Sequence, residues 1–339
     1  MSGRALVTGS TGMLGSYIVE RLSAGGWTVR ALTRARGAGS WLAATGAELV
    51  EGDIQDADSM VRAATGCDVV FHAAAVIGSG GAWEAFHKGN VVGTEHVVRA
   101  AEAAGARLVH VSSTAVYGGA RYRSEPTDEC APLPDLPEHD VYGRSKQEGE
   151  RLVLQAHEAG RIWAAVVRPP VMYGRRDRQF APRIGPVLAR GFFPRIAGGR
   201  TTLTVVHASS VAEGAVLAAT TGSAGGRVYL LTNDHPVTTT DLVRYAEAGL
   251  ERRIWSPDVS ARAGQAGFSA LAAVVRAIGR GDLARHASGT LDMLTRDNPF
   301  TSARARCELG WAPALRPEVG LTDAFRWWKD NHASAAGGT

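Results

Sequence analysis

A tyrosine and a lysine near the middle of the chain form the first group that could do chemistry. Tyr142 and Lys146 lie in the segment YGRSK, four residues apart, so on a helix their side chains would share one face. A phenol ordinarily titrates near about pH 10, and a neighbouring ammonium favours the phenolate and lowers that pKa. Tyr142 could then pass a proton to or from a carbonyl or alcohol oxygen. We expect Tyr142 to be an acid–base group supported by Lys146.

Hydroxyl groups upstream of Tyr142 form the second candidate group. The segment SSTAVYG at 112–118 follows a strand-like run. The carboxyl ends of strands in a parallel sheet are where ligands bind, and a hydroxyl there can stabilise charge that develops on a substrate oxygen. We assign this role to Ser113, with Thr114 as the second choice.

The segment TGSTGMLG at 8–15 is typical of a dinucleotide-binding loop between a strand and a helix. Gly9 would allow the tight turn, Gly12 would let the backbone approach a pyrophosphate, and Gly15 would let the helix pack closely on the strand. The helix N-terminus offers free N–H groups to the phosphates. A nicotinamide cofactor bound here would place its ring beside Tyr142 and its ribose against Lys146. The expected cofactor contacts in this loop are Gly9, Thr11, Gly12, Met13, Leu14 and Gly15.

The end of the second predicted strand favours NADP. NAD-specific folds usually place Asp or Glu there to hold the ribose 2′-hydroxyl, whereas this chain has Thr33 and Arg34, with Arg36 close by. A guanidinium matches a 2′-phosphate. The alternative is a solvated Arg34 in a protein that uses either cofactor, so NAD stays open. GDI at 52–54 follows the third strand, and we expect Asp53 and Ile54 to meet the adenine.

The elements that must position these residues are short apolar strands alternating with helices. This pattern predicts an α/β fold with a doubly wound parallel sheet. We expect a dinucleotide-binding domain over 1–168, to which 201–231 returns, a smaller and mostly helical substrate lobe from 169–200 and 232–330, and a frayed tail over 331–339. The predicted strands are 4–8, 28–33, 48–51, 68–72, 108–112 and 164–168, and the predicted helices are 13–24, 56–64, 83–104 and 141–158.

In this order the motifs resemble the extended short-chain dehydrogenase/reductase family, which has a Rossmann-type fold. The resemblance implies that Ser113, Tyr142 and Lys146 are the catalytic triad and that Asn90 supports the sheet. It also implies that Ala73, Ala74 and Ala75 line the cofactor cleft and that Arg168 and Pro169 lead into the loop on its nicotinamide side. The motifs that carry it are TGSTGMLG at 8–15, GDI at 52–54, HAAA at 72–75, NVVGT at 90–94, SSTAVYG at 112–118, YGRSK at 142–146 and RPPVMYG at 168–174.

The branch of the family is indicated by two further features. The acidic pair that sugar-nucleotide dehydratases place after the fifth-strand hydroxyl is replaced by Thr114 and Ala115, and LTVVHASSVA at 203–212 resembles the hydroxysteroid dehydrogenase and dihydroflavonol reductase-like branch. This favours an NADP(H)-dependent reductase or dehydrogenase that interconverts a ketone and a secondary alcohol. A nucleotide-sugar 4-epimerase with tightly bound NAD and a non-catalytic NADP sensor remain as alternatives. The side chains Phe192, Phe193, Phe268 and Leu271 suggest a hydrophobic substrate, although core packing explains them equally well.

Composition narrows the remaining possibilities. No apolar run approaches the roughly 20 residues of a membrane helix, so we expect no membrane partner. The only cysteines, Cys67, Cys130 and Cys307, form no Cys-x-x-Cys pair, which fits a reducing cytoplasm without disulfides or a thiolate zinc site.

Scattered charge argues against a nucleic-acid partner. Lys and Arg number 37 against 33 Asp and Glu, but their only local cluster is Arg175, Arg176, Arg178 and Arg183, for which a solvated loop is favoured over a phosphate or carboxylate clamp. We expect no metal, because His72, His110 and His207 lie in or beside apolar strands and have no ligand spacing. The helix over 83–104 could face the core or form a homodimer surface.

Overall fold

The central element is a seven-stranded sheet with the order β11-β6-β5-β4-β1-β2-β3. In the computed structural model, which describes residues 3–35, 37, 39–78, 81–233, 235–277 and 295–332, every neighbouring pair in this sheet is parallel. The expected α/β fold with a doubly wound parallel sheet is therefore confirmed. The strands are β1 (Arg4–Thr8), β2 (Thr28–Thr33), β3 (Glu48–Glu51), β4 (Val69–His72), β5 (Arg107–Val111), β6 (Ala164–Arg168) and β11 (Val228–Leu230).

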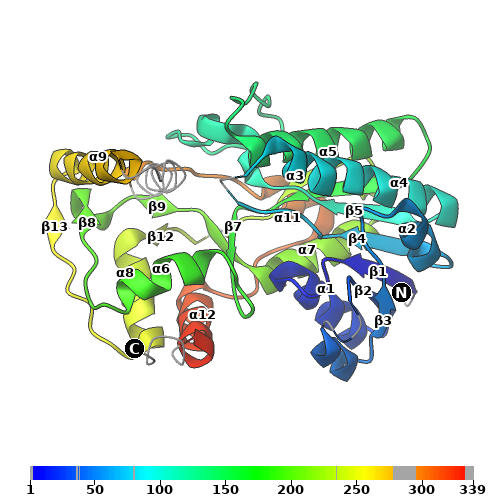
Figure 1. Ribbon diagram of the computed structural model, residues 1–339, viewed down its shortest axis with the longest axis horizontal. Helices are drawn as coiled ribbons and strands as arrows, with labels where there is room; N and C mark the ends of the chain where they lie inside the picture. Colours follow the sequence, from blue (N-terminus) through cyan, green and yellow to red (C-terminus); the bar gives the residue numbers. More distant parts are fainter. Residues whose placement is uncertain are drawn as a thin grey trace.

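Helices cover both faces of this sheet (Figure 1). Alternate strand residues point to opposite faces, so in β1 the side chains of Ala5 and Val7 join one core cluster and Leu6 joins the other. Both faces are apolar because a parallel sheet is buried on both sides. One face is covered by α1 (Met13–Ala24), α7 (Ala208–Thr220) and α11 (Ala303–Leu309), and the other by α2 (Ala57–Ala64), α4 (Gly93–Ala104) and α5 (Val141–Glu158).

The helix expected over 83–104 is interrupted. It consists of α3 (Trp83–Phe86), a π-helical segment over His87–Val92 and α4. The π-helical segment contains Asn90, whose side-chain amide pairs with the backbone N–H and carbonyl of Val76 at 2.7 and 2.9 Å and donates to Ser145 Oγ at 2.9 Å. Such π-helical turns are frequent at functional sites, and this one ties the segment after β4 to the helix that carries Tyr142.

A second lobe follows β6 and β11. Its own core includes Tyr173, Phe193, Leu242 and Phe325, and Trp328 packs over Gly185. Within 201–231, α7 and β11 pack with the large sheet, whereas β9 pairs with β12 of the lobe. The lobe contains β7 (Val171–Tyr173), α6 (Phe180–Leu188), β8 (Arg195–Ile196), β9 (Thr202–Leu203), β10 (Val205–His207), β12 (Val237–Thr238), α8 (Thr239–Leu250), β13 (Asp258–Val259), α9 (Ala261–Ala277) and α12 (Pro317–His332).

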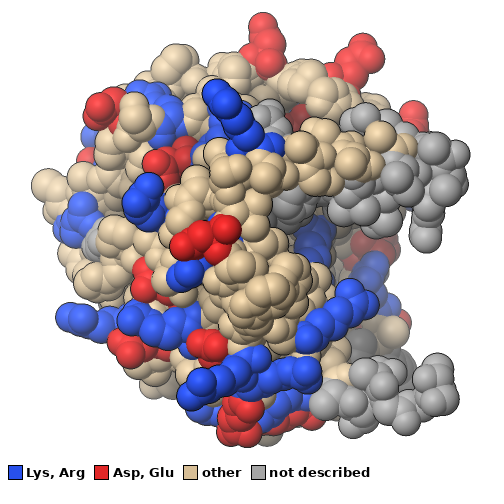
Figure 2. All heavy atoms as spheres, turned by 90° about the vertical axis from the view of Figure 1, so that its left-hand side faces the viewer, with Lys and Arg blue, Asp and Glu red and all other residues tan. Residues whose placement is uncertain are grey.

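The face of the lobe seen in Figure 2 carries Lys and Arg side chains interspersed with Asp and Glu, not one basic stripe. A nucleic-acid-binding surface concentrates its positive charge, so this face does not have that character. Among the described helices, none combines the length and the apolar character that a membrane crossing requires. The predicted tail overlaps the end of α12 at His332, and 333–339 lie outside the described residues.

Candidate active site

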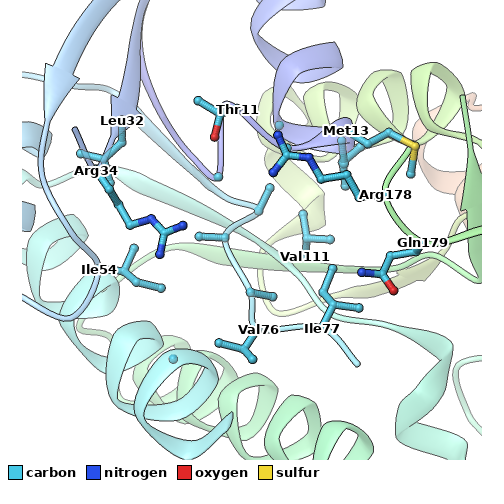
Figure 3. A pocket seen from close by; sticks show the side chains of 18 of the residues that line it. Thr11, Met13, Leu32, Arg34, Ile54, Val76, Ile77, Val111, Arg178 and Gln179 are labelled. Atoms are coloured by element: carbon cyan, nitrogen blue, oxygen red, sulfur yellow. The ribbon is translucent and has the colours of Figure 1, made fainter. Parts of the chain in front are cut away.

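A cavity of about 390 Å³ lies along the carboxyl edge of the large sheet. It opens beside β1, the point where the strand order reverses and where ligands bind in folds of this type. Its wall is built from the segments after β1, β2, β3, β4 and β5, from α5, and from the loop between β7 and α6 (Figure 3). The sequence-predicted residues that it brings together are Gly9, Thr11, Gly12, Met13, Leu14, Gly15, Arg34, Asp53, Ile54, Ala73, Ala74, Ala75, Tyr142 and Lys146.

The glycine loop has the backbone that the sequence predicts. Gly9 has φ of 65°, and a Cβ there would lie 2.7 Å from the backbone nitrogen of Ala74. At Gly15 a Cβ would lie 2.1 Å from the carbonyl oxygen of Gly9, so only glycine allows this contact between helix and strand end. At Gly12 a Cβ would meet only that same oxygen, at 3.1 Å, which leaves the space above it open. No acidic residue lies in the first turn of α1. The open space and the free N–H groups suit a pyrophosphate.

The opposite end of the cavity holds Arg34, Asp53 and Ile54. The Arg34 side chain points into the cavity (Figure 3) and has no ion pair within the part of the chain that the structure describes. The Asp53 carboxylate accepts a hydrogen bond from the backbone N–H of Gln55 at 2.9 Å. Arg36, the second expected arginine, lies outside the described residues.

The predicted catalytic residues meet where β5 ends and α5 begins. Asp140 caps α5 by accepting a hydrogen bond from Gly143 N–H at 3.0 Å, which places Tyr142 in the first turn. Lys146 is only 3% exposed and donates from Nζ to the carbonyl oxygen of Val111 at 2.6 Å. Ser113 is not part of the cavity wall; its hydroxyl accepts a hydrogen bond from Ala115 N–H at 3.1 Å and lies close enough to Tyr142 to influence the pKa of the phenol. The strand end and the helix face therefore bring all three together.

The protonation of Tyr142 differs from the sequence-based expectation. Burial raises the pKa of the phenol, the hydrogen bond with Ser113 opposes this, and the Asp140 carboxylate adds to it. The expected lowering does not hold for the protein chain itself, where burial of the phenol dominates its pKa. Lys146 Nζ donates to the Val111 carbonyl. Burial lowers the pKa of Lys146 to about 8, opposed by Glu150. At neutral pH Tyr142 is thus a protonated phenol that can donate a proton.

Arg168 and Pro169 are not brought to the cavity wall. The Arg168 guanidinium is buried, where it forms two hydrogen bonds with the Glu150 carboxylate and one with the Tyr117 hydroxyl at 2.6 Å. The Pro169 carbonyl accepts a hydrogen bond from Thr114 N–H at 3.0 Å. A buried guanidinium requires such partners, so the Arg168 side chain holds β6 against α5.

Several wall residues were not predicted from the sequence. Ser112 is buried, and its Oγ has no hydrogen-bond partner among the described residues. An unpartnered buried hydroxyl is costly, and this one belongs to a residue of the cavity wall. The sequence contained a signal for Ser112, because this residue directly precedes Ser113 in the same motif. The other additions include Leu32, Val76, Ile77, Met172, Arg178 and Gln179.

The three histidines that were expected to be structural are buried. His72 shares hydrogen bonds with Thr8 at 2.8 Å and Thr94 at 3.0 Å, and burial lowers its pKa to about 3. His110 lies beside it, with ring centroids 5.3 Å apart, but neither of its ring nitrogens has a hydrogen-bond partner among the described residues. His207 pairs with Ser209 at 2.6 Å. No cluster of three or more His, Cys, Asp or Glu residues suited to a metal occurs in the described ranges.

Comparison with protein families and curated proteins identifies the class. Residues 5–231 match the NAD dependent epimerase/dehydratase family. The chain is 35% identical over 331 residues to the 4-hydroxy-2-methyl-3-oxo-4-farnesyl-3,4-dihydroquinoline-1-oxide ketoreductase of Stigmatella aurantiaca, covering 95% of this chain and 96% of that protein. It is 29% identical to a 3 beta-hydroxysteroid dehydrogenase/Delta 5-->4-isomerase of Mycobacterium tuberculosis, covering 96% of this chain and 90% of that protein.

Solved structures agree on the fold. The crystal structure of gox2253 has a TM-score of 0.76 at 28% identity and is matched over 97% of this chain and 98% of that one. The UDP-glucuronic acid 4-epimerase of Bacillus cereus in complex with NAD has a TM-score of 0.74 at 18% identity, with 97% and 99% covered. The chain belongs to the NAD-dependent epimerase/dehydratase family of extended short-chain dehydrogenases/reductases. Within that family it is an NAD(P)-dependent oxidoreductase.

Proposed function

We propose that this protein is an NADP(H)-dependent ketoreductase that interconverts a hydrophobic ketone and its secondary alcohol. The observation that carries the proposal is that Tyr142, Lys146 and the glycine loop line one cavity. Dinucleotide binding and proton transfer thus share a single site. When bound, NADPH would supply the hydride, which is chemistry that belongs to the cofactor.

The chain's own groups would orient the ketone and supply the proton. Tyr142 and Ser113 would hydrogen-bond the carbonyl oxygen of the ketone. The raised pKa keeps the Tyr142 phenol protonated at neutral pH, so it would give its proton to that oxygen. Lys146, held by the Val111 carbonyl, would place an ammonium beneath the cofactor ribose.

NADP is proposed over NAD because of Arg34. Its guanidinium faces the cavity (Figure 3) without an ion pair among the described residues. The same end of the cavity also holds Asp53, whose carboxylate is engaged with the Gln55 backbone. A guanidinium pairs with a 2′-phosphate through charge-assisted hydrogen bonds.

A hydrophobic substrate is proposed from the cavity wall and from the relatives. Val76, Ile77 and Met172 give the wall apolar surface, and two curated relatives are named as reductases of a farnesyl-substituted oxo compound and of 2-alkyl-3-oxoalkanoates. Phe192 and Phe193 do not contribute, because Phe192 packs against Trp255 at the surface with tilted rings and Phe193 is buried in the lobe core. The side chains of Phe268 and Leu271 are not among those that the structure describes.

The test is a substrate screen with NADPH and NADH, following nicotinamide absorbance. The panel contains 2-alkyl-3-oxoalkanoates, bicyclic aromatic ketones and UDP-sugars. Net oxidation of NADPH with ketones, abolished in Tyr142→Phe, supports the proposal. Interconversion of UDP-sugars without net change in the cofactor would establish the 4-epimerase alternative. Cofactor binding without turnover, unaffected by Tyr142→Phe, would establish the sensor alternative.

We also propose a cytoplasmic location, supported by the unpaired state of all three cysteines.

A further inference from the structure

The loop between β7 and α6 carries Arg175, Arg176 and Arg178, and Arg183 follows within α6. Three of these four arginines have partners. Arg175 pairs with Asp323 at 3.5 Å, Arg176 with Glu20 at 2.7 Å, and Arg183 donates to the Gln179 side chain at 2.8 Å. Arg178 has no ion pair or hydrogen bond within the described ranges, and it lines the cavity. The sequence favoured a solvated loop for these arginines. In the structure one of them, Arg178, also lines the cavity of the cofactor site.

The backbone on the N-terminal side of Arg178 is anchored to the dinucleotide-binding domain. Arg176 adopts φ of 65°, a conformation that costs energy for a residue with a side chain. Its guanidinium lies over the rings of Trp41 and Tyr17, at 4.5 and 5.1 Å from their centroids. With the ion pair to Glu20, these contacts hold the loop against α1 and the segment that contains Trp41.

The backbone on the C-terminal side is fixed by Asp177. Its carboxylate is buried and accepts hydrogen bonds from the N–H groups of Gln179, Phe180 and Ala181 at 2.7, 3.0 and 2.7 Å. This carboxylate is fully used by the start of α6, so it does not neutralise Arg178. The turn therefore presents Arg178 from a fixed position, although its side chain is exposed.

Arg178 and Arg34 reach the cavity from different domains. In Figure 3 the Arg178 side chain extends over the glycine-loop side of the cavity, where Thr11 and Met13 lie, whereas Arg34 lies beside Ile54. The N–H groups at the start of α1 already give the glycine-loop side a positive potential. A guanidinium added to that side has the charge and the paired donors that a phosphate requires.

We infer that Arg178 binds the pyrophosphate of the dinucleotide from the lobe side, while Arg34 takes the 2′-phosphate. The inference rests on the proposed dinucleotide site but not on the ketone. A pyrophosphate is common to NADP(H) and NAD(H), so Arg178 contributes equally to both, whereas Arg34 discriminates between them. Cofactor binding would also hold the lobe's β7–α6 loop to the dinucleotide-binding domain.

The experiment measures dissociation constants of the full-length protein for NADPH, NADH and ADP-ribose by isothermal titration calorimetry. ADP-ribose keeps the pyrophosphate without the nicotinamide or the 2′-phosphate. For Arg178→Ala we expect all three constants to rise by a similar factor of about ten to a hundred, typical of lost hydrogen bonds to a charged group. Arg178→Lys should recover part of this loss. Arg190→Ala, an exposed arginine beyond the end of α6, is the matched control and should change none of them.

Three results would overturn the inference. A loss confined to NADPH would assign Arg178 to the 2′-phosphate. Unchanged constants for all three ligands would make it a solvated residue. A raised KM for the ketone with unchanged cofactor constants would make it a substrate contact. Failure of the proposed ketone reduction is distinguished from these results, because the calorimetric measurement needs no turnover.

Discussion

The buried ion pair between Arg168 and Glu150 is the contact whose loss should destabilise this protein most clearly. The two side chains are only 5% and 3% exposed, and the guanidinium also donates to the Tyr117 hydroxyl at 2.6 Å. Arg168→Met would leave the Glu150 carboxylate buried without its partner, which costs about 3–5 kcal/mol. That is a large fraction of the roughly 5–15 kcal/mol that stabilises a typical fold.

The double variant Arg168→Met/Glu150→Leu should recover most of this loss. It removes both charges, and replacing a buried pair by apolar residues is often close to neutral. The Tyr117 hydroxyl keeps its bond to the Asp128 carbonyl at 2.9 Å. Urea unfolding of the wild type, both single variants and the double variant gives the coupling energy, which should be about 3 kcal/mol or more on this reasoning.

Two results would refute the reasoning. If the double variant loses the sum of the two single losses, the pair is not coupled through an unpaired charge. If folded Arg168→Met binds NADPH much more weakly than the wild type, Arg168 contacts the cofactor after all, although its side chain lies away from the cavity wall. In a folded Glu150→Leu variant the pKa of Lys146 should fall below the value of about 8, because Glu150 raises that pKa in the wild type.

Three further predictions address the site and its protonation. Tyr142→Phe should lower turnover by about 10²–10⁴ while leaving the dissociation constant of NADPH unchanged, and a variant that retains turnover would remove Tyr142 from the proton-transfer role. Because the pKa of Tyr142 is raised, ketone reduction should persist through neutral pH and decline in alkali, while alcohol oxidation should increase in alkali; pH profiles in both directions test this, and oxidation fastest in acid would contradict it. His72 has a pKa of about 3 in the folded protein against 6.5 ordinarily, so its contribution to stability is complete above pH 6.5 and is lost as the pH falls toward 3. Urea unfolding across this range should show a flatter acid dependence for His72→Asn than for the wild type, and identical slopes would refute the assignment.

Elements with strong local signals were predicted closely from the sequence. The expected helices 13–24 and 141–158 and the strand 164–168 coincide with α1, α5 and β6, because their apolar periodicity is continuous and each start is marked locally. Gly12 precedes α1, and Asp140 caps α5. The seventh strand, β11, was not predicted, since three residues are too few for a pattern and the strand exists through its pairing with β6.

Long-range contacts explain the interruption of the helix over 83–104. Apolar spacing alone favours one continuous α-helix there. The π-helical segment instead presents Asn90 to Val76 and Ser145, which lie in two other parts of the chain. Nothing local in 87–92 indicates these partners, so the sequence pattern could not predict a π-helical turn in place of an α-helical one.

The candidate site also contains residues that local sequence could predict and residues whose positions depend on distant partners. The glycine-loop residues were predictable because their roles depend on backbone conformation within one short segment. The placement of Arg168 depends on Glu150, a residue of another element, and the direction of Arg178 depends on Arg176 reaching Glu20 across the domain boundary. A cluster of arginines in the sequence does not reveal which members have acidic partners in the fold.

The protonation of Tyr142 connects the fold to the direction of the reaction. Lys146 donates to the carbonyl at the end of β5, so its ammonium ties strand to helix. The phenol is governed mainly by burial, which raises its pKa and keeps its proton, while Ser113 opposes that rise. A protonated phenol is prepared to donate, which is the role that carbonyl reduction requires. Oxidation requires loss of that proton first, so we expect the rate of oxidation to rise with pH.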